Sequence, residues 1–339
     1  MRRIIALLVC AVALIAPALA ETMPVAALAQ HTHLHGLAVD RQDASRLLIA
    51  THHGLFRAGP DGKAERISVV QDFMGFSPHP RDADILYASG HPPQGGNLGF
   101  IASNDGGRNW RQVSPGLNGP VDFHQMTVSP TDPARIYGVH GGLQISRDGG
   151  KSWALVGPAP PRIIGLAASG KHADQLYAAT EAGLLHSPDA GKTWQVLLPG
   201  VVVTLVAVTG DGGRYIFAIG RGLLHAPEDQ ADFSNLSNDF AGEFLLHLAI
   251  DPTNPRRLFA ATGKGRVLIS EDQGRRWGAF GGGKVGWMPL QHPSDTVWIT
   301  SLSAAAVVLE LPDIDLVRLF ADLPSVNARS VTYGAIHNP

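Results

Sequence analysis

An internal repeat dominates the sequence and restricts the fold to few architectures. Four segments share the pattern Ser-x-Asp-x-Gly-x-x-Trp, at residues 103–110, 146–153, 187–194 and 270–277. Their aspartates follow one another at intervals of 43, 41 and 83 residues. The last interval equals two periods, and a degenerate copy of the pattern lies inside it at residues 226–230. Another degenerate copy, at residues 59–63, lies one period before the first intact one. A regular period of this length indicates a repeat architecture.

Each period has room for four short apolar strands bounded by Gly, Pro, Asp or Asn. In one period we expect these strands at residues 125–132, 135–139, 142–146 and 153–156. Four short strands in about 40 residues are typical of a β-propeller blade. We therefore predict an all-β fold, a single β-propeller with four-stranded blades. The first strands of its blades are expected to begin near Leu34, Phe73, Phe123, Ile163, Val202, Phe244 and Val285. This count favours seven blades, with six and eight left open by the uncertain ends of the chain.

The repeated box itself is explained by blade structure. Its Asp is suited to accept backbone N–H groups across a tight hairpin, its glycines to adopt turn conformations, and its Trp to pack into the blade. Because the pattern recurs between the third and fourth strands of several blades, we assign its aspartates to structure and not to a catalytic site.

The first twenty residues have the pattern of a secretory signal peptide. Arg2 and Arg3 precede an apolar run that is too short to span a bilayer, and Ala18 and Ala20 form a small-x-small cleavage site. We expect residues 1–20 to be removed and residues 21–339 to form the propeller domain, in the periplasm or secreted, without membrane insertion. The single cysteine, Cys10, would leave with the signal, so a hydrophobic core would have to stabilise the domain without disulfides. The net charge of −2 gives no reason to expect a nucleic-acid partner.

The boxes resemble those of the Asp-box, or BNR-repeat, β-propellers, which include sialidases, sortilin-type receptors and a photosystem II assembly factor. A narrower resemblance, to small secreted bacterial Asp-box proteins filed as glycosyl hydrolases, rests on four further motifs. These are His-Leu-His-Gly at 33–36, Asp-Phe-Met-Gly-Phe-Ser at 72–77, Ser-Gly-His-Pro at 89–92 and Asp-Phe-His-Gln-Met at 122–126. The wider resemblance implies the fold, and the narrower one implies a glycosidase activity that the residues themselves must support.

Histidine, methionine and aspartate gather in the first three periods. Nine of the 15 histidines fall between His31 and His140. When the first strands are aligned by the turn that follows them, His35, Met74 and His124 share one column. His33, Asp72 and Asp122 share the column two residues earlier, so both columns are expected on one face of the strands. The turns between the second and third strands, which should lie on the same rim of the channel, carry His52, His91 and His140.

This combination predicts a metal site at one rim of the channel, for metal handling or metal-dependent redox chemistry. We expect His35, Met74 and His124 as ligands, with His33, His91 and Met126 completing the set. Asp72, Asp122, His52 and His140 are candidates for a second layer that orients the imidazoles. Imidazole with thioether favours copper, and zinc is the weaker alternative because it prefers His, Cys and carboxylate ligands.

Two other functions remain open on the sequence. A glycosidase could use Asp72 and Asp122 as its pair of carboxylates. A sialidase is disfavoured, because the channel strands offer only Arg162 where that chemistry needs three arginines. The chain could also be a binding scaffold or assembly factor that holds a periplasmic protein or peptide at the channel rim, whose opposite wall is apolar.

Overall fold

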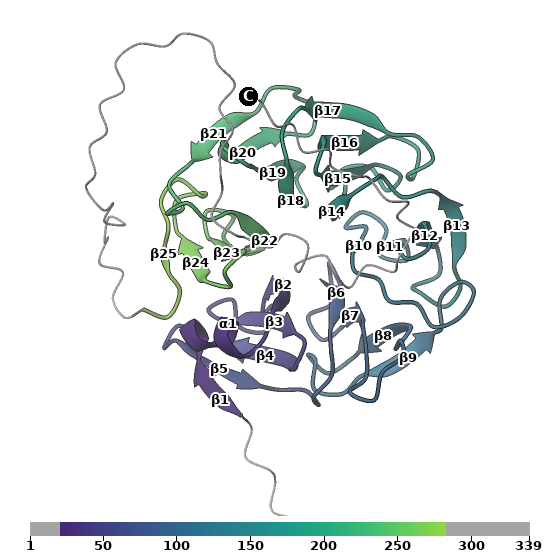
Figure 1. The fold of residues 1–339 in the computed structure, drawn as a ribbon, viewed down its shortest axis with the longest axis horizontal. Coiled ribbons are helices and arrows are strands. Elements are labelled where there is room, and N and C mark those ends of the chain that lie inside the picture. The colour runs from purple at the N-terminus through teal and green to yellow at the C-terminus, as the bar shows by residue number, and fades with distance from the viewer. Residues whose placement is uncertain (1–20, 283–339) are drawn as a thin grey trace, which may run out of the picture. The chain divides into compact units, whose positions relative to one another are not determined.

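A computed structural model describes residues 21–282, which form six antiparallel β-sheets around a central channel (Figure 1). Each sheet is one blade, and the innermost strands are β2, β6, β10, β14, β18 and β22. The signal peptide predicted at residues 1–20 and the innermost strand expected near Val285 lie outside the described residues. The all-β fold and the four-stranded antiparallel blades predicted from the repeat are confirmed.

The first blade has an additional strand from the start of the described chain. Its sheet runs in the order β1-β5-β4-β3-β2, so that β1 forms the outer edge. The elements of this blade are β1 (Thr22–Pro24), η1 (Val25–Ala27), α1 (Leu28–His31), β2 (Leu34–Val39), β3 (Leu47–Thr51), β4 (Gly54–Ala58) and β5 (Lys63–Arg66).

The next five blades have four strands each, in sequence order from the channel outward. Blades 2 and 3 consist of β6 (Met74–Pro78), β7 (Leu86–Ser89), β8 (Phe100–Ser103), β9 (Arg111–Ser114), β10 (Met126–Val128), β11 (Ile136–Val139), β12 (Leu143–Ser146) and β13 (Ala154–Gly157). Blades 4 and 5 consist of β14 (Ile163–Ala168), β15 (Leu176–Thr180), β16 (Gly183–Ser187), β17 (Gln195–Pro199), β18 (Val203–Val208), β19 (Gly213–Ala218), β20 (Gly222–Pro227) and β21 (Ser234–Ser237). Blade 6 consists of β22 (Leu245–Ile250), β23 (Leu258–Thr262), β24 (Val267–Ser270) and β25 (Gly278–Ala279).

The repeated box closes the hairpin between the third and fourth strands, as the sequence predicts. In blade 2, Ser103 Oγ donates to Asp105 Oδ1 at 2.8 Å and accepts the Gly107 amide at 2.9 Å. The same aspartate oxygen accepts the Asn109 amide at 2.9 Å, and the Trp110 indole N–H donates to the Gly107 carbonyl at 2.8 Å. All four boxes repeat the Ser–Asp and Trp bonds, so these aspartates and tryptophans hold hairpins together.

The ring closes after six blades, and the prediction of seven is wrong. The innermost strands contact one another in sequence order, and β22 of the sixth blade packs directly on β2 of the first. A buried cluster at this junction joins Ile49 and Phe56 of blade 1 to Ala249, Phe259 and Phe280 of blade 6. This closure leaves no place for another sheet between them. The sequence count went wrong because the spacing of strands along the chain does not report where the ring closes.

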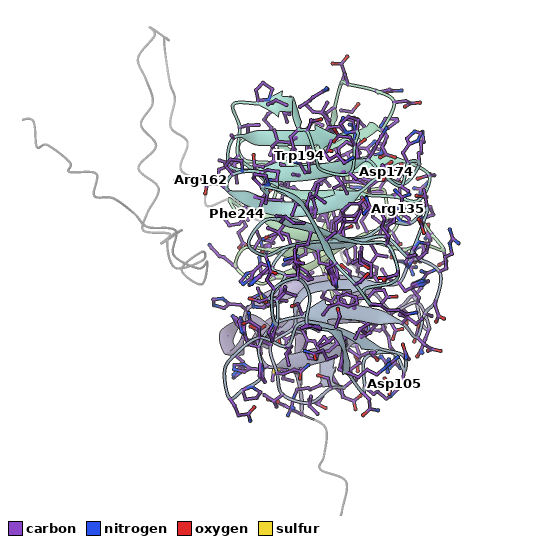
Figure 2. All side chains as sticks on the ribbon, turned by 90° about the vertical axis from the view of Figure 1, so that its right-hand side faces the viewer. Asp105, Arg135, Arg162, Asp174, Trp194 and Phe244 are labelled. Atoms are coloured by element: carbon purple, nitrogen blue, oxygen red, sulfur yellow. The ribbon has the colours of Figure 1, made fainter. Side chains whose placement is uncertain are left out.

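The Asp-box hairpins and the entrances to the innermost strands lie on opposite faces of the ring. Figure 2 shows Arg162 and Phe244, which precede the innermost strands of blades 4 and 6, on one face, and Asp105 of a box on the other. The box aspartates are therefore remote from the rim at which the sequence placed its candidate ligands.

Candidate metal centre

Two compact sets of histidine and aspartate lie at the rim where the innermost strands begin. We call them set A, made of His35, His52 and Asp72, and set B, made of His91, Asp122 and His124. In each set the three ligand atoms lie within 4.8 Å of one another. Blades 1 and 2 supply set A, and blades 2 and 3 supply set B.

Set B is organised around one oxygen of Asp122. Nε2 of His124 lies 2.7 Å and Nε2 of His91 lies 3.0 Å from Asp122 Oδ2. The other ring nitrogen of His91, Nδ1, lies 2.9 Å from the carbonyl oxygen of Gly96, in the loop that follows β7. Asp122 is only 6% exposed, and its Oδ1 is buried with no hydrogen-bond partner among the described residues. The carboxylate thus faces two imidazoles on one side and has spare acceptor capacity on the other.

Set A has the same composition with a different internal arrangement. His52, in the turn between β3 and β4, places Nδ1 2.9 Å from Asp72 Oδ2. The ring of His35, on β2, meets the ring of His52 edge to face at a centroid distance of 4.1 Å. Nε2 of His35 and Oδ1 of Asp72 are both buried with no hydrogen-bond partner in the described part of the chain. Set A therefore holds an unsatisfied nitrogen on His35 and an unsatisfied oxygen on Asp72.

Electrostatic shifts show what the two sets prefer without a metal. Burial lowers the pKa of His91, but the Gly96 carbonyl and the carboxylates of Asp122 and Asp72 outweigh it, and the pKa is raised. Burial raises the pKa of Asp122, but the hydrogen bond from His124 and the nearby imidazoles outweigh it, and the pKa is lowered. Both directions favour an imidazolium–carboxylate pair in set B.

His35 of set A behaves in the opposite way. Burial, followed by the neighbouring imidazoles of His52 and His247, lowers the pKa of His35 to about 2. His35 is therefore a neutral imidazole throughout the physiological range, which is the form that binds metals.

The other predicted residues lie around these sets. His33 is exposed, with its ring centroid 5.5 Å from that of His52. His140 contacts the backbone of set B and not its carboxylate: its Nδ1 lies 3.1 Å from the backbone carbonyl oxygen of Asp122. The sequence analysis expected some of these residues only to orient the ligand imidazoles. The structure places three of them within the two sets themselves: Asp72, Asp122 and His52.

The two methionines, Met74 of the His35–His124 column and Met126 two residues beyond it, differ from the histidines in their surroundings. Met126 is buried in a core cluster that includes Tyr87, Phe100 and Phe123, and it also lines the channel cavity. Met74 is 6% exposed and does not line that cavity, although His35 and His124 do. In blade 2 the strand irregularity falls between Met74 and Ser77, whereas in blade 1 it falls at His35 itself.

The channel beneath the sets is a cavity of about 180 Å³. His35 and His124 line it on one side, and the strands of blades 4 to 6 contribute Ile164, Leu166, Leu205 and Leu246. His247, on β22, is a further histidine in this wall that the sequence analysis missed. Its signal was a lone histidine in an otherwise apolar innermost strand, one position after the column used to align the blades.

Comparison with known proteins supports the fold. The BNR/Asp-box repeat model matches residues 144–155. No curated protein matches the sequence. The six sheets make the fold a β-propeller, and the family model matches the box hairpin of its third blade.

Solved structures with the same fold come from different classes of protein. A GH74 xyloglucanase from Xanthomonas campestris is 20% identical, with a TM-score of 0.51, over 77% of this chain and 46% of the xyloglucanase. A GH74 enzyme from Niastella koreensis is 15% identical, with a TM-score of 0.53, over 73% of this chain and 45% of that enzyme. The extracellular domain of a hybrid two-component system from B. thetaiotaomicron is 14% identical, with a TM-score of 0.51, over 77% and 34%.

This chain matches less than half the length of each of these proteins, and at such identities the likeness concerns the fold. Among residues 21–282, no helix is long and apolar enough to cross a membrane.

Proposed function

We propose that this Asp-box propeller binds a transition-metal ion through set B at the rim of its channel. The observation that carries the proposal is the position of the His91 ring between two acceptors. Nδ1 lies against the Gly96 carbonyl and Nε2 against the Asp122 carboxylate. A neutral imidazole has one N–H and one lone pair, so it can satisfy only one of these contacts.

A cation next to Nε2 resolves this conflict, and that cation is either a proton or a metal ion. A metal ion would bind the Nε2 lone pair and the carboxylate together, while Nδ1–H continues to donate to Gly96. A backbone carbonyl that accepts from the second ring nitrogen is the usual support of a metal-binding histidine. His124 supplies a second imidazole, and the unpartnered Oδ1 of Asp122 supplies a further donor atom.

The donors of set B are two imidazoles and a carboxylate, which suit Cu(II), Zn(II) and Fe(II). Copper(II) binds such nitrogen and oxygen sites most tightly among the divalent ions, so copper remains the metal that we propose, with zinc second. The preference for Cu(I) that two thioethers would give is weakened, because Met74 does not line the cavity and Met126 packs in the core. Copper handling or copper-dependent redox chemistry outside the cytoplasm, after export by the predicted signal, is the role that we propose.

Hydrolysis by Asp72 and Asp122 has less support. A glycosidase of this kind needs one carboxylic acid whose pKa is raised so that it can protonate the leaving group. The pKa of Asp122 is lowered instead, and each aspartate already contacts a histidine. The likeness to the GH74 enzymes concerns the fold alone.

Metal binding to the purified chain tests the proposal. Isothermal titration with Cu(II) and Zn(II) is expected to show binding that His91→Ala and Asp122→Asn weaken at least tenfold. His172→Ala, at an exposed turn of blade 4, is the matched control and is expected to bind like the parent. Equal affinities for the parent and both set B variants would refute the assignment.

A further inference from the structure

The two sets are built from equivalent positions of neighbouring blades. His52 lies in the turn between the second and third strands of blade 1, and His91 occupies the corresponding place in blade 2. Asp72 and Asp122 precede the innermost strands of blades 2 and 3 in the same way. Each pair therefore joins a turn histidine of one blade to an aspartate of the next, at 2.9 Å for His52 and Asp72 and 3.0 Å for His91 and Asp122.

The histidine–aspartate pair is not repeated between blades 3 and 4, and the residue that precedes the innermost strand of blade 4 explains why. There Arg162 occupies the place of the aspartate and binds Glu181 at 2.6 Å. The turn histidine of blade 3, His140, consequently has no carboxylate in that position, and its ring lies against the backbone of Asp122 instead. The same construction is thus complete at two neighbouring blade junctions and interrupted at the third.

We infer that set A is a second metal site, so that the rim binds two divalent ions in neighbouring, separate sites. The inference rests on the proposed function of set B for the class of ligand, but on different residues. Each set has its own carboxylate and two imidazoles, and the sets share no residue.

Two buried atoms in set A indicate the ligand. Asp72 is 9% exposed, and its Oδ1 has no hydrogen-bond partner within residues 21–282. His35 Nε2 is also buried without a partner there. A buried nitrogen and a buried carboxylate oxygen without partners are unfavourable, and a shared cation satisfies both at once. One ligand atom from each of His35, His52 and Asp72 lies within 4.8 Å of the other two, a spacing that a small shift of side chains converts into coordination.

The two ions would influence each other. The two sets are direct neighbours, because the backbone N–H of Asp72 in set A donates to the backbone carbonyl of His91 in set B at 2.9 Å. A charge bound in one set therefore acts on the other. A divalent ion and one carboxylate together leave a net charge of +1 in each occupied set, so the two occupied sets would repel each other. The second ion is therefore expected to bind more weakly than the first, with two resolved affinities.

Metal content and titration of the purified chain test the inference. The parent is expected to retain two Cu(II) ions after gel filtration, as measured by elemental analysis. His52→Ala and Asp72→Asn are each expected to retain one ion, His91→Ala is expected to retain one, and His52→Ala combined with His91→Ala none. Circular dichroism and thermal unfolding check that each variant folds, and His52→Gln provides a more conservative replacement.

The outcomes separate the two proposals. One ion in the parent that His52→Ala leaves in place, and that His91→Ala removes, would overturn the second site while leaving set B intact. One ion that only the set A variants remove would overturn both the two-ion inference and the proposed function of set B.

Discussion

Replacing Asp122 by Asn in the metal-free protein should destabilise the fold in a way that depends on pH. The side chain is 6% exposed and meets two imidazoles, at 2.7 Å for His124 and 3.0 Å for His91. A hydrogen bond to a buried charged group contributes about 1.5–3 kcal/mol. The His91 side chain is 40% exposed, so its share is screened by solvent. We expect a loss of about 2 kcal/mol, which lowers Tm by about 4–8 °C in a domain of this size.

The signs of the two pKa shifts define the window of this effect. The pKa of Asp122 is lowered on folding, so its contribution is present above the pKa of an unfolded Asp and is lost as pH falls through the folded value. The pKa of His91 is raised, so its contribution is present below the pKa of an unfolded His and is lost as pH rises through the folded value. The difference between parent and Asp122→Asn should therefore be largest at about pH 5–6 and should shrink on either side.

Denaturant unfolding at pH 3.5, 5.5 and 8.5 in the presence of a chelator measures this difference. Asp61→Asn, whose side chain is 60% exposed, is the control and should cost little at any pH. A deficit for Asp122→Asn that does not change with pH, or no deficit at pH 5.5, would contradict the ion-pair account of set B.

Three further predictions concern the fold and the metal. Phe259→Ala at the junction of blades 6 and 1 should cost about 3–5 kcal/mol, measured by denaturant unfolding, because the ring is fully buried; a loss below about 1 kcal/mol would argue against closure there. Gly150→Ala should cost more than Gly149→Ala, although both have positive φ, because a Cβ at Gly150 would lie 1.9 Å from Phe100 Cε1 and one at Gly149 would meet open space. We expect about 1–2 kcal/mol for Gly149→Ala and at least 1 kcal/mol more for Gly150→Ala, and equal losses would contradict this packing. Free copper at 100 times the Kd of set B should stabilise the protein by about 2.7 kcal/mol through that site alone in thermal unfolding, and an unchanged Tm would count against binding to the folded state.

Much of the fold followed from the sequence because the box is a local structure. Ser103, Asp105 and Trp110 make their bonds within one hairpin, so their spacing alone predicts the turn and its place in the blade. The number of blades is a different kind of property. It depends on packing between residues far apart in the chain, such as Phe56 and Phe280 in the buried cluster where blades 1 and 6 meet, which no local pattern reports.

The candidate site could be predicted only to the level of the rim. Strand periodicity placed His35 and His124 at the channel, and the structure has both there. Their division into two sets arises because each turn histidine reaches the aspartate of the next blade, a contact between residues about 20 to 30 positions apart. The position of Met74 depends on where the strand irregularity falls, which the sequence does not indicate.

Anomalous X-ray scattering from crystals of the copper-loaded chain would locate bound copper and so test whether set B binds it. We expect a copper peak in set B, within coordination distance of Nε2 of His91, Nε2 of His124 and a carboxylate oxygen of Asp122. A peak elsewhere on the protein, with His91 and Asp122 still in direct contact and no metal between them, would contradict it.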